Sequence, residues 1–344
     1  MRVILFKLLG ASLLAGSLVA GWFWLDYRNF ATTPMELPED GLEYVVEPGK
    51  GLAVIGRDLE GRGLLASSRY LIWMGRITGS TARIKAGTYQ LTPGTTPEGL
   101  LKQLVEGKVA QFPLTLVEGW SFRQVLDALA RHPRLKQTLT GLSDAEIMSR
   151  LGYPGVHPEG RFYPDTYRFP QGFTDVAFLQ RAYRAMEERL AYEWERREEG
   201  LPYRSAYEGL IMASIVEKET GLASERPAIA GVFVRRLQKR MRLQTDPTVI
   251  YGLGLDFDGN LRRRDLENHT PYNTYRIRGL PPTPIAMPGG EALHAAFHPA
   301  PGNELYFVAR GDGSHHFSAT LEEHNAAVVK YQLKGRRKVF SSSK

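Results

Sequence analysis

The stretch from Gly209 to Ile250, GLIMASIVEKETGLASERPAIAGVFVRRLQKRMRLQTDPTVI, contains two apolar runs with helical spacing, followed by a polar segment. In the first run, steps of three and four residues connect Met212, Ile215, Val216, Glu219 and Leu222. Residues at these steps share one face of a helix, so Glu219 is expected on a stripe that otherwise faces the core. The stretch predicts packed helices that support a polar site.

Glu219 is the candidate general acid of this site. Burial disfavours the charged form of a carboxyl and raises its pKa, which lets a glutamate donate a proton near neutral pH. The alternative is that Glu219 pairs with a buried arginine or lies at the rim of the stripe. Glu217 points to a different face, beside Ala213 and Leu210, where it could support the site, although the pattern favours an exposed glutamate there.

Five segments carry a resemblance to a known family: IVEKET (215–220), ASER (223–226), RLQTDPTVIYGLG (242–254), YNTY (272–275) and GLPPTPIAMPG (279–289). With these segments the chain resembles the endolytic murein transglycosylase family, also called the YceG-like family, from its apolar N-terminal segment to about His324. The resemblance implies a bacterial inner-membrane enzyme that cuts glycan strands of nascent peptidoglycan and could terminate their polymerisation. It also implies that the second glutamate of VEKE, Glu219, is catalytic.

The implied reaction cleaves the bond between N-acetylmuramic acid and N-acetylglucosamine without water and leaves a 1,6-anhydromuramyl end. Glycosidases with two carboxylates need a second acid as base or nucleophile. A lytic transglycosylase can dispense with it, because the 6-hydroxyl of the sugar is the nucleophile. Glu219 would then protonate the leaving oxygen and later accept the hydroxyl proton.

Two polar segments supply candidate substrate-binding residues. Pro247 restricts Asp246 to extended geometry, which favours a loop presenting Gln244, Thr245 and Asp246 to a ligand, with a structural turn as the alternative. In YNTY the candidates are Tyr272, Asn273 and Tyr275. Asn273 either binds an acetamido group of the sugar or closes a turn.

An aromatic segment, EGRFYPDTYRFP at 159–170, adds weaker candidates. Aromatic rings can stack on sugars, but core packing is their commoner role. The second-tier candidates are Phe162, Tyr163, Asp165 and Tyr167.

The N-terminal region predicts a membrane anchor. Residues 8–25 carry no charge and approach the roughly 20 residues that span a bilayer. Arg2 and Lys7 precede them and Asp26 follows, so the N-terminus is expected in the cytoplasm and the rest of the chain outside the inner membrane. A cleavable signal peptide is the competing interpretation, but Trp22 and Trp24 lie where small cleavage-site residues are expected.

The expected fold class is α+β, with a single transmembrane helix, a LysM-like βααβ module and a mixed α/β catalytic domain. Predicted elements of the module are a strand at 44–46, helices at 52–59 and 68–77, a strand at 84–91 and a helix at 97–106. The module either contacts glycan or acts as a spacer. The expected parts are a cytoplasmic N-terminus (1–7), the anchor (8–25), a tether (26–41), the module (42–110), a connecting region packed on the catalytic domain (111–170), the catalytic domain (171–330) and a basic tail (331–344).

The amino-acid composition excludes several kinds of catalytic and metal-binding site. The chain has 344 residues, 43% of them hydrophobic and 24% charged, with a net charge of +7. The absence of cysteine excludes disulfides, thiolate catalysis and cysteine metal sites. No cofactor is expected, and no nucleic-acid motif occurs. The expected partners are peptidoglycan glycan strands, the inner membrane and cell-wall synthases.

Metal sites are not expected from the sequence. His294 and His298 have the four-residue spacing of helical zinc ligands, but no glutamate follows the first of them and Pro299 ends the helix. Two rival classes stay open. One is a metal-dependent wall hydrolase that uses His294, His298 or His315, and the other is a noncatalytic wall-binding scaffold.

Overall fold

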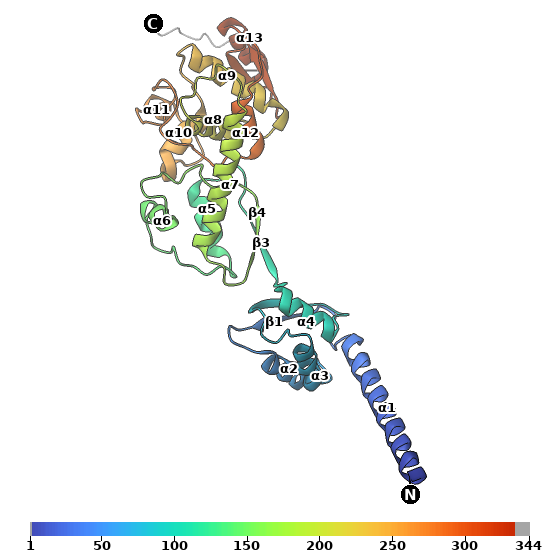
Figure 1. Ribbon diagram of the computed structural model, residues 1–344. Helices are drawn as coiled ribbons and strands as arrows, with labels where there is room; N and C mark the ends of the chain where they lie inside the picture. The colour runs from blue at the N-terminus through green and yellow to red at the C-terminus, as the bar shows by residue number, and fades with distance from the viewer. Residues whose placement is uncertain (1, 334–344) are drawn as a thin grey trace. The chain divides into compact units, whose positions relative to one another are not determined.

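The computed structural model describes residues 2–333, and these form two compact units (Figure 1). Unit 1 comprises residues 1–112 and 168–172, and unit 2 comprises 113–167 and 173–344. The chain leaves unit 1 within β3 (Gln111–Thr115) and returns briefly in β4 (Thr166–Pro170), which pairs with β3. The basic tail predicted over 331–344 lies outside the described residues from 334 onward.

Unit 1 begins with one long helix, α1 (Arg2–Thr32), drawn in blue in Figure 1. Its segment from Phe6 to Thr32 is long and apolar enough to cross a membrane, and none of its most apolar window is buried against the protein. Large apolar side chains such as Leu14, Leu18 and Trp22 are about two-thirds exposed. A lipid environment would bury them, as expected of a membrane anchor.

The segment expected as a tether is packed instead. Helix α1 runs on to Thr32, and Phe30, Ala31 and Met35 are buried in the core of unit 1. The packing of these apolar side chains offsets the entropy lost on ordering the segment. Residues 29–35 are therefore part of the folded unit.

The βααβ order predicted for the next segment is confirmed. Strand β1 (Leu42–Val46) is followed by α2 (Leu52–Gly61), α3 (Ser68–Ile77), β2 (Gly87–Leu91) and α4 (Pro97–Glu106). Strands β1 and β2 pair antiparallel, from Leu42 opposite Leu91 to Val46 opposite Gly87. The Thr96 hydroxyl caps α4, which ends at left-handed Gly107.

Unit 2 is mostly helical. Its helices are α5 (Phe122–Arg131), α6 (Asp144–Leu151), α7 (Asp175–Glu195), α8 (Ala206–Glu219), α9 (Arg226–Gln238), α10 (Asp246–Leu253), α11 (Arg263–Glu267), α12 (Gly290–Phe297) and α13 (Leu321–Tyr331). Short 3₁₀ turns occupy Ala223–Glu225 and Gly254–Asp256, and β5 (Tyr306–Ala309) and β6 (His315–Ser318) form an antiparallel hairpin.

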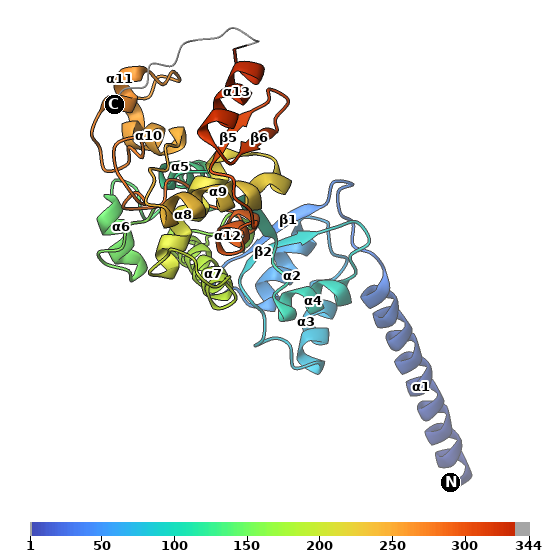
Figure 2. The ribbon, with the colours of Figure 1, turned by 90° about the horizontal axis from the view of Figure 1, so that it is seen from above.

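Helix α8 lies at the centre of unit 2, with α7, α9 and α12 around it (Figure 2). Every residue from Gly209 to Val216 is buried, so this part of the helix has no exposed face. The helix is capped by Ser205, whose hydroxyl accepts the Glu208 N–H. The stripe ends earlier than expected, because Thr220 is extended and Leu222 lies beyond the helix, 43% exposed.

The close approach of α8 and α12 depends on Gly209. A β-carbon at this position would overlap the ring of Phe297, which is fully buried against Trp194 and Tyr203. Since this ring is packed on its other sides, it has little room to retreat.

We predict that Gly209→Ala lowers the free energy of unfolding by about 1–3 kcal/mol, the usual cost of overpacking a core. This loss should outweigh the gain in helix propensity, which is about 1 kcal/mol at most. The measurement is denaturant unfolding of the purified chain.

Gly221→Ala is the matched control, because open space surrounds its added β-carbon. If both variants unfold at the wild-type denaturant concentration, the Gly209 contact does not limit the packing of α8.

Candidate active site

A cavity of about 550 Å³ opens in unit 2 at the C-terminal end of α8. Its walls come from α8, α9, the segment before α10, Tyr275, the β5–β6 hairpin and α13. Five of the predicted site residues line it: Glu219, Gln244, Thr245, Asp246 and Tyr275. The cavity is therefore assembled from segments up to about a hundred residues apart in the chain.

Glu219 is the last residue of α8 and faces this cavity. Burial of its carboxyl raises its pKa from the ordinary value to about 7. The hydrogen bond that Thr245 Oγ1 donates to Glu219 Oε1 opposes this rise, whereas the negative charge of Asp246 adds to it. More weakly, His315 and Arg236 also favour the carboxylate. Glu219 can therefore exchange a proton near neutral pH.

The Thr245 hydroxyl is positioned by a buried network of threonines. The Thr245 N–H donates to Thr274 Oγ1 over 3.0 Å, and the hydroxyls of Thr248 and Thr274 lie 2.9 Å apart. Before them, Gln244 has a φ of 56°, a left-handed conformation that is uncommon for a residue with a side chain. Such backbone strain persists only where the surroundings enforce it, and it is frequent at functional sites.

Asp246 differs from the sequence prediction in its backbone. It is the first residue of α10, with Thr245 as N-cap and Pro247 in the first turn, so the predicted loop ends at Thr245. Proline suits the first turn of a helix because its missing N–H has no partner there. The exposed Asp246 carboxylate accepts a hydrogen bond of 2.6 Å from the Tyr275 hydroxyl.

Tyr272 and Asn273 do not line the cavity. Asn273 is fully buried, and its amide nitrogen donates to the carbonyls of Asp265, Leu266 and Asn268 at 2.6–3.1 Å. Its carbonyl oxygen accepts the Tyr275 N–H. Asn273 thus closes the loop that carries Tyr275, while the Tyr272 hydroxyl lies 2.8 Å from that of Thr283.

Glu217 is buried, and the expectation that it is exposed is wrong. Its side chain is 6% exposed and forms an ion pair of 3.1 Å with Arg226. Its other oxygen accepts the Gly289 N–H over 2.9 Å. Arg226 also pairs with Glu291 at 2.7 Å. Glu217 therefore ties α8 to the starts of α9 and α12, outside the cavity.

Sequence reasoning missed Arg236 as a residue of the cavity wall, and it named His315 only as a metal ligand of a rival class of enzyme. Arg236 occupies the buried stripe of α9 with Ile229, Val232 and Phe233, so the spacing argument used for Glu219 could have found it. Its guanidinium donates to the carbonyls of Leu305, Arg242 and Leu243.

His315 gave no local signal, because a hairpin distant in sequence brings it to the cavity. Its N–H and its Nδ1 lie 2.9 Å and 2.7 Å from the two carboxylate oxygens of Glu225. Glu225 belongs to the ASER segment, which therefore fixes the start of β6 at the cavity.

The second-tier aromatic candidates lie elsewhere. Phe162 is fully buried and stacks on Phe122 at a centroid distance of 5.2 Å, and the Tyr167 hydroxyl donates to the Tyr163 carbonyl. None of these residues lines the cavity, and neither does Asp165. Their described contacts are those of packing residues.

Comparisons with known proteins agree with this architecture. The model of the YceG-like family matches residues 44–330. The chain is 32% identical over 304 residues to an endolytic murein transglycosylase of Bacillus subtilis, covering 83% of each chain. It is 27% identical to one of Streptococcus pneumoniae, of which it spans 65%.

A solved structure shares the fold. The crystal structure of a yceG-like protein from Listeria monocytogenes is 31% identical, with a TM-score of 0.55, and the match covers 84% of this chain and 99% of that one. The family match extends over most of the chain, including the cavity and the two glutamates of VEKE. On this evidence the chain belongs to the YceG-like family.

Proposed function

We propose that this protein is an endolytic peptidoglycan lytic transglycosylase with Glu219 as its proton-transferring residue. The activity is the one for which its relatives in Bacillus and Streptococcus are named. The observation that carries the residue assignment is a buried carboxyl, with a pKa raised to about 7, at the wall of a cavity large enough for a ligand.

In the first half of the proposed reaction, protonated Glu219 gives its proton to the oxygen that bridges the two sugars. The bond between this oxygen and C1 of N-acetylmuramic acid breaks, and N-acetylglucosamine leaves as the new hydroxyl. In the second half, the 6-hydroxyl of the muramyl sugar attacks C1 and gives its proton to the Glu219 carboxylate. Glu219 ends protonated, so one residue serves both halves and no water enters the product.

Neighbouring side chains would adjust this proton transfer. Thr245 donates to Glu219 Oε1 and stabilises the carboxylate formed after the first half. Asp246 has the opposite effect, since its negative charge favours the protonated form from which the reaction starts. A pKa near 7 results from opposing influences and leaves Glu219 able to donate and then accept.

The sugar would be held by polar and aromatic groups of the cavity wall. Gln244 and Asp246 are exposed toward solvent, and Tyr306 and Phe307 add partly buried aromatic surface to the cavity wall beside them. We propose that Tyr275 orients Asp246 and that Tyr272 and Asn273 act through the loop that carries Tyr275.

Hydrolysis is the second candidate reaction, and Asp246 is the reason to consider it. Inverting glycosidases use one carboxylic acid and one carboxylate that activates water. Glu219 and Asp246 both line the cavity, so Asp246 could act as that base. The two reactions differ in their products, since only hydrolysis incorporates solvent oxygen.

We further propose that the βααβ segment of unit 1 is LysM-like and serves as a spacer or a glycan contact outside the membrane. The order of its elements and the antiparallel β1–β2 pair support this. Helix α1 would anchor the chain in the inner membrane with residues 1–7 in the cytoplasm, near the cell-wall synthases that make the strands.

We predict that Glu219→Gln lowers turnover of uncrosslinked glycan strands by about 10²–10⁴-fold while the fold is retained, because the amide can neither donate nor accept the proton. Products of the wild-type enzyme should carry 1,6-anhydro ends and no label when the reaction runs in heavy-oxygen water. Mass spectrometry measures both ends and label.

Glu217→Gln is the control. It should stay active, since Glu217 lies outside the cavity, and it should be less stable because the ion pair with Arg226 is weakened. An inactive but folded Glu217→Gln, or near-normal turnover by Glu219→Gln, would contradict the assignment. Labelled products would move the proposal to hydrolysis.

We predict opposite shifts in pH dependence from two neighbours of Glu219. The wild-type kcat/KM should fall as pH rises through about 7, where the free enzyme loses the proton it must donate. Thr245→Val removes a donor that favours the carboxylate, so its fall should lie at higher pH. Asp246→Asn removes a charge that favours the acid, so its fall should lie at lower pH.

Thr245→Ser, which keeps the hydroxyl, should follow the wild-type profile.

The free energy of unfolding provides a second test of the raised pKa of Glu219. The folded state holds the Glu219 proton more tightly than the unfolded state, so this group destabilises the fold progressively from about pH 4.5 to about 7. Glu219→Gln should therefore gain stability relative to the wild type over this window; an unchanged difference would refute the raised pKa.

We predict that protease added outside the inner membrane degrades the chain beyond about Asp26, because basic residues precede the apolar segment and favour the cytoplasm. Immunoblotting of spheroplasts measures this. Complete protection of the intact chain, with a known periplasmic protein degraded in the same sample, would reverse the orientation.

A further inference from the structure

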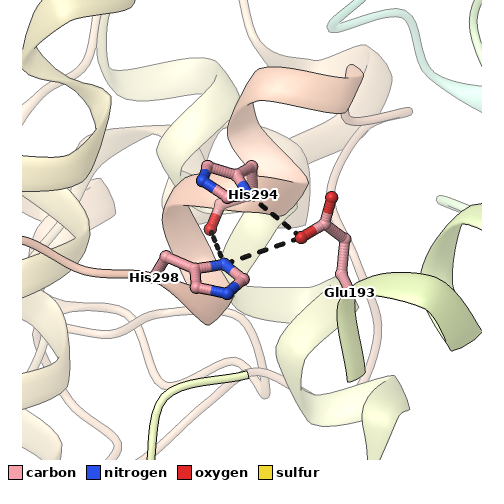
Figure 3. A group of neighbouring side chains, drawn as sticks. All are labelled: Glu193, His294 and His298. Carbon is pink, nitrogen blue, oxygen red and sulfur yellow. Dashed lines mark hydrogen bonds and ion pairs between the residues drawn. The ribbon is translucent and has the colours of Figure 1, made fainter. Parts of the chain in front are cut away.

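A second group of side chains that could bind a ligand lies away from the cavity, between α7 and α12. Figure 3 shows Glu193, near the end of α7, beside His294 in α12 and His298 just after it. None of the three lines the cavity that contains Glu219. The proposed reaction gives them no role, so their convergence needs a separate explanation.

The spacing of their atoms matches the coordination sphere of a metal ion. The Nδ1 atoms of His294 and His298 lie 3.1 Å and 3.6 Å from the same oxygen, Oε2 of Glu193. One ligand atom from each residue lies within 4.8 Å of the others. In a tetrahedral zinc site, bonds of about 2.0–2.1 Å place the ligand atoms about 3.3–3.4 Å apart.

In a neutral His298 ring, the hydrogen bond of Nε2 leaves the lone pair of Nδ1 facing two oxygen atoms that also carry lone pairs. Its Nε2 lies 2.8 Å from the Arg196 carbonyl, which can only accept, so Nε2 carries the hydrogen. In the neutral ring Nδ1 is then an acceptor, yet it faces the His294 carbonyl at 3.2 Å and Glu193 Oε2 at 3.6 Å. With a neutral ring, three electron-rich atoms therefore converge and a bound cation would relieve their repulsion, whereas a second proton on the ring would satisfy the same contacts.

The surroundings hold these ligands in place. Glu193 has a side chain only 1% exposed, and its other oxygen, Oε1, pairs with Arg189 Nη2 at 2.6 Å, which leaves Oε2 toward the histidines. Metal-binding histidines usually donate their second N–H to a carbonyl or carboxylate, as His298 does to Arg196. The His294 and His298 rings stack, with centroids 4.2 Å apart and 20° between their planes. Glu193 and His298 are therefore oriented, and the partly exposed His294 ring would turn about its side-chain bonds to direct a nitrogen at an ion.

We propose that Glu193, His294 and His298 bind a divalent transition-metal ion, for which Zn²⁺ is the best match. Two imidazoles and one carboxylate are ligands that suit Zn²⁺ and are too few and too nitrogen-rich for Mg²⁺ or Ca²⁺. Water would complete the coordination, because the His294 side chain is 57% exposed.

This ion would have a structural role. It would connect α7 to α12, and α12 packs against α8, the helix that ends in Glu219. Since no ligand reaches the cavity, the ion would stabilise unit 2 without taking part in proton transfer.

The test uses the full chain in detergent, without an affinity tag, after removal of metal with a chelator. Isothermal titration with Zn²⁺ should show one site per chain, and Zn²⁺ should raise the melting temperature because it binds the folded state. The same concentration of Mg²⁺ should have no effect. Turnover well below the melting temperature should be the same with and without Zn²⁺.

Two single-ligand variants and one control complete the design. His294→Ala and His298→Ala should each weaken Zn²⁺ binding by at least about tenfold and lose the Zn²⁺-dependent rise in melting temperature. His269→Ala, which removes an exposed histidine elsewhere, should bind as the wild type does.

Equal Zn²⁺ binding by the wild type and both ligand variants would overturn the proposal, as would the absence of a stoichiometric site in the wild type. It would also be overturned if NMR of the ring nitrogens showed His298 protonated on both nitrogens in the presence of Zn²⁺. In that case a proton, and not a metal, would occupy the space between the acceptors.

Discussion

The contact between the Glu219 carboxyl and the Thr245 hydroxyl is the interaction on which the candidate site depends. The carboxyl is buried at the end of α8, where the Thr245 hydroxyl donates a hydrogen bond to one of its oxygens. Its position at the C-terminus of α8 adds the partial negative charge of the helix end, which also disfavours the carboxylate. A carboxyl placed in this way stays protonated where an exposed glutamate would be ionised.

The rest of unit 2 serves to hold that helix end. Helix α8 is surrounded by α7, α9 and α12, and its approach to α12 requires the glycine at 209. Glu217 fixes the same helix through a buried ion pair with Arg226. The two glutamates of VEKE are two positions apart on the helix, so their side chains point to different faces. Glu219 faces the cavity, and Glu217 faces the packing interface.

The two neighbouring residues Glu225 and Arg226 of the ASER segment contact different parts of unit 2. Arg226 holds Glu217 in the interface, while Glu225 holds the backbone and ring of His315 at the cavity wall. A short segment therefore couples the support of α8 to the placement of the hairpin β5–β6. Substitutions there would change the shape of the cavity without touching its central carboxyl.

The sequence by itself determined the apolar N-terminal helix, the βααβ order, the helical run that ends at Glu219 and the candidacy of that residue, because each follows from local periodicity, capping or the family resemblance. Only the tertiary structure decided that α10 begins at Asp246, that Glu217 is buried and that Asn273 closes a loop. It also brought Arg236 and His315 to the cavity and assembled Glu193, His294 and His298. These outcomes depend on contacts between residues about five to a hundred positions apart in different segments, which periodicity within one helix or strand does not encode.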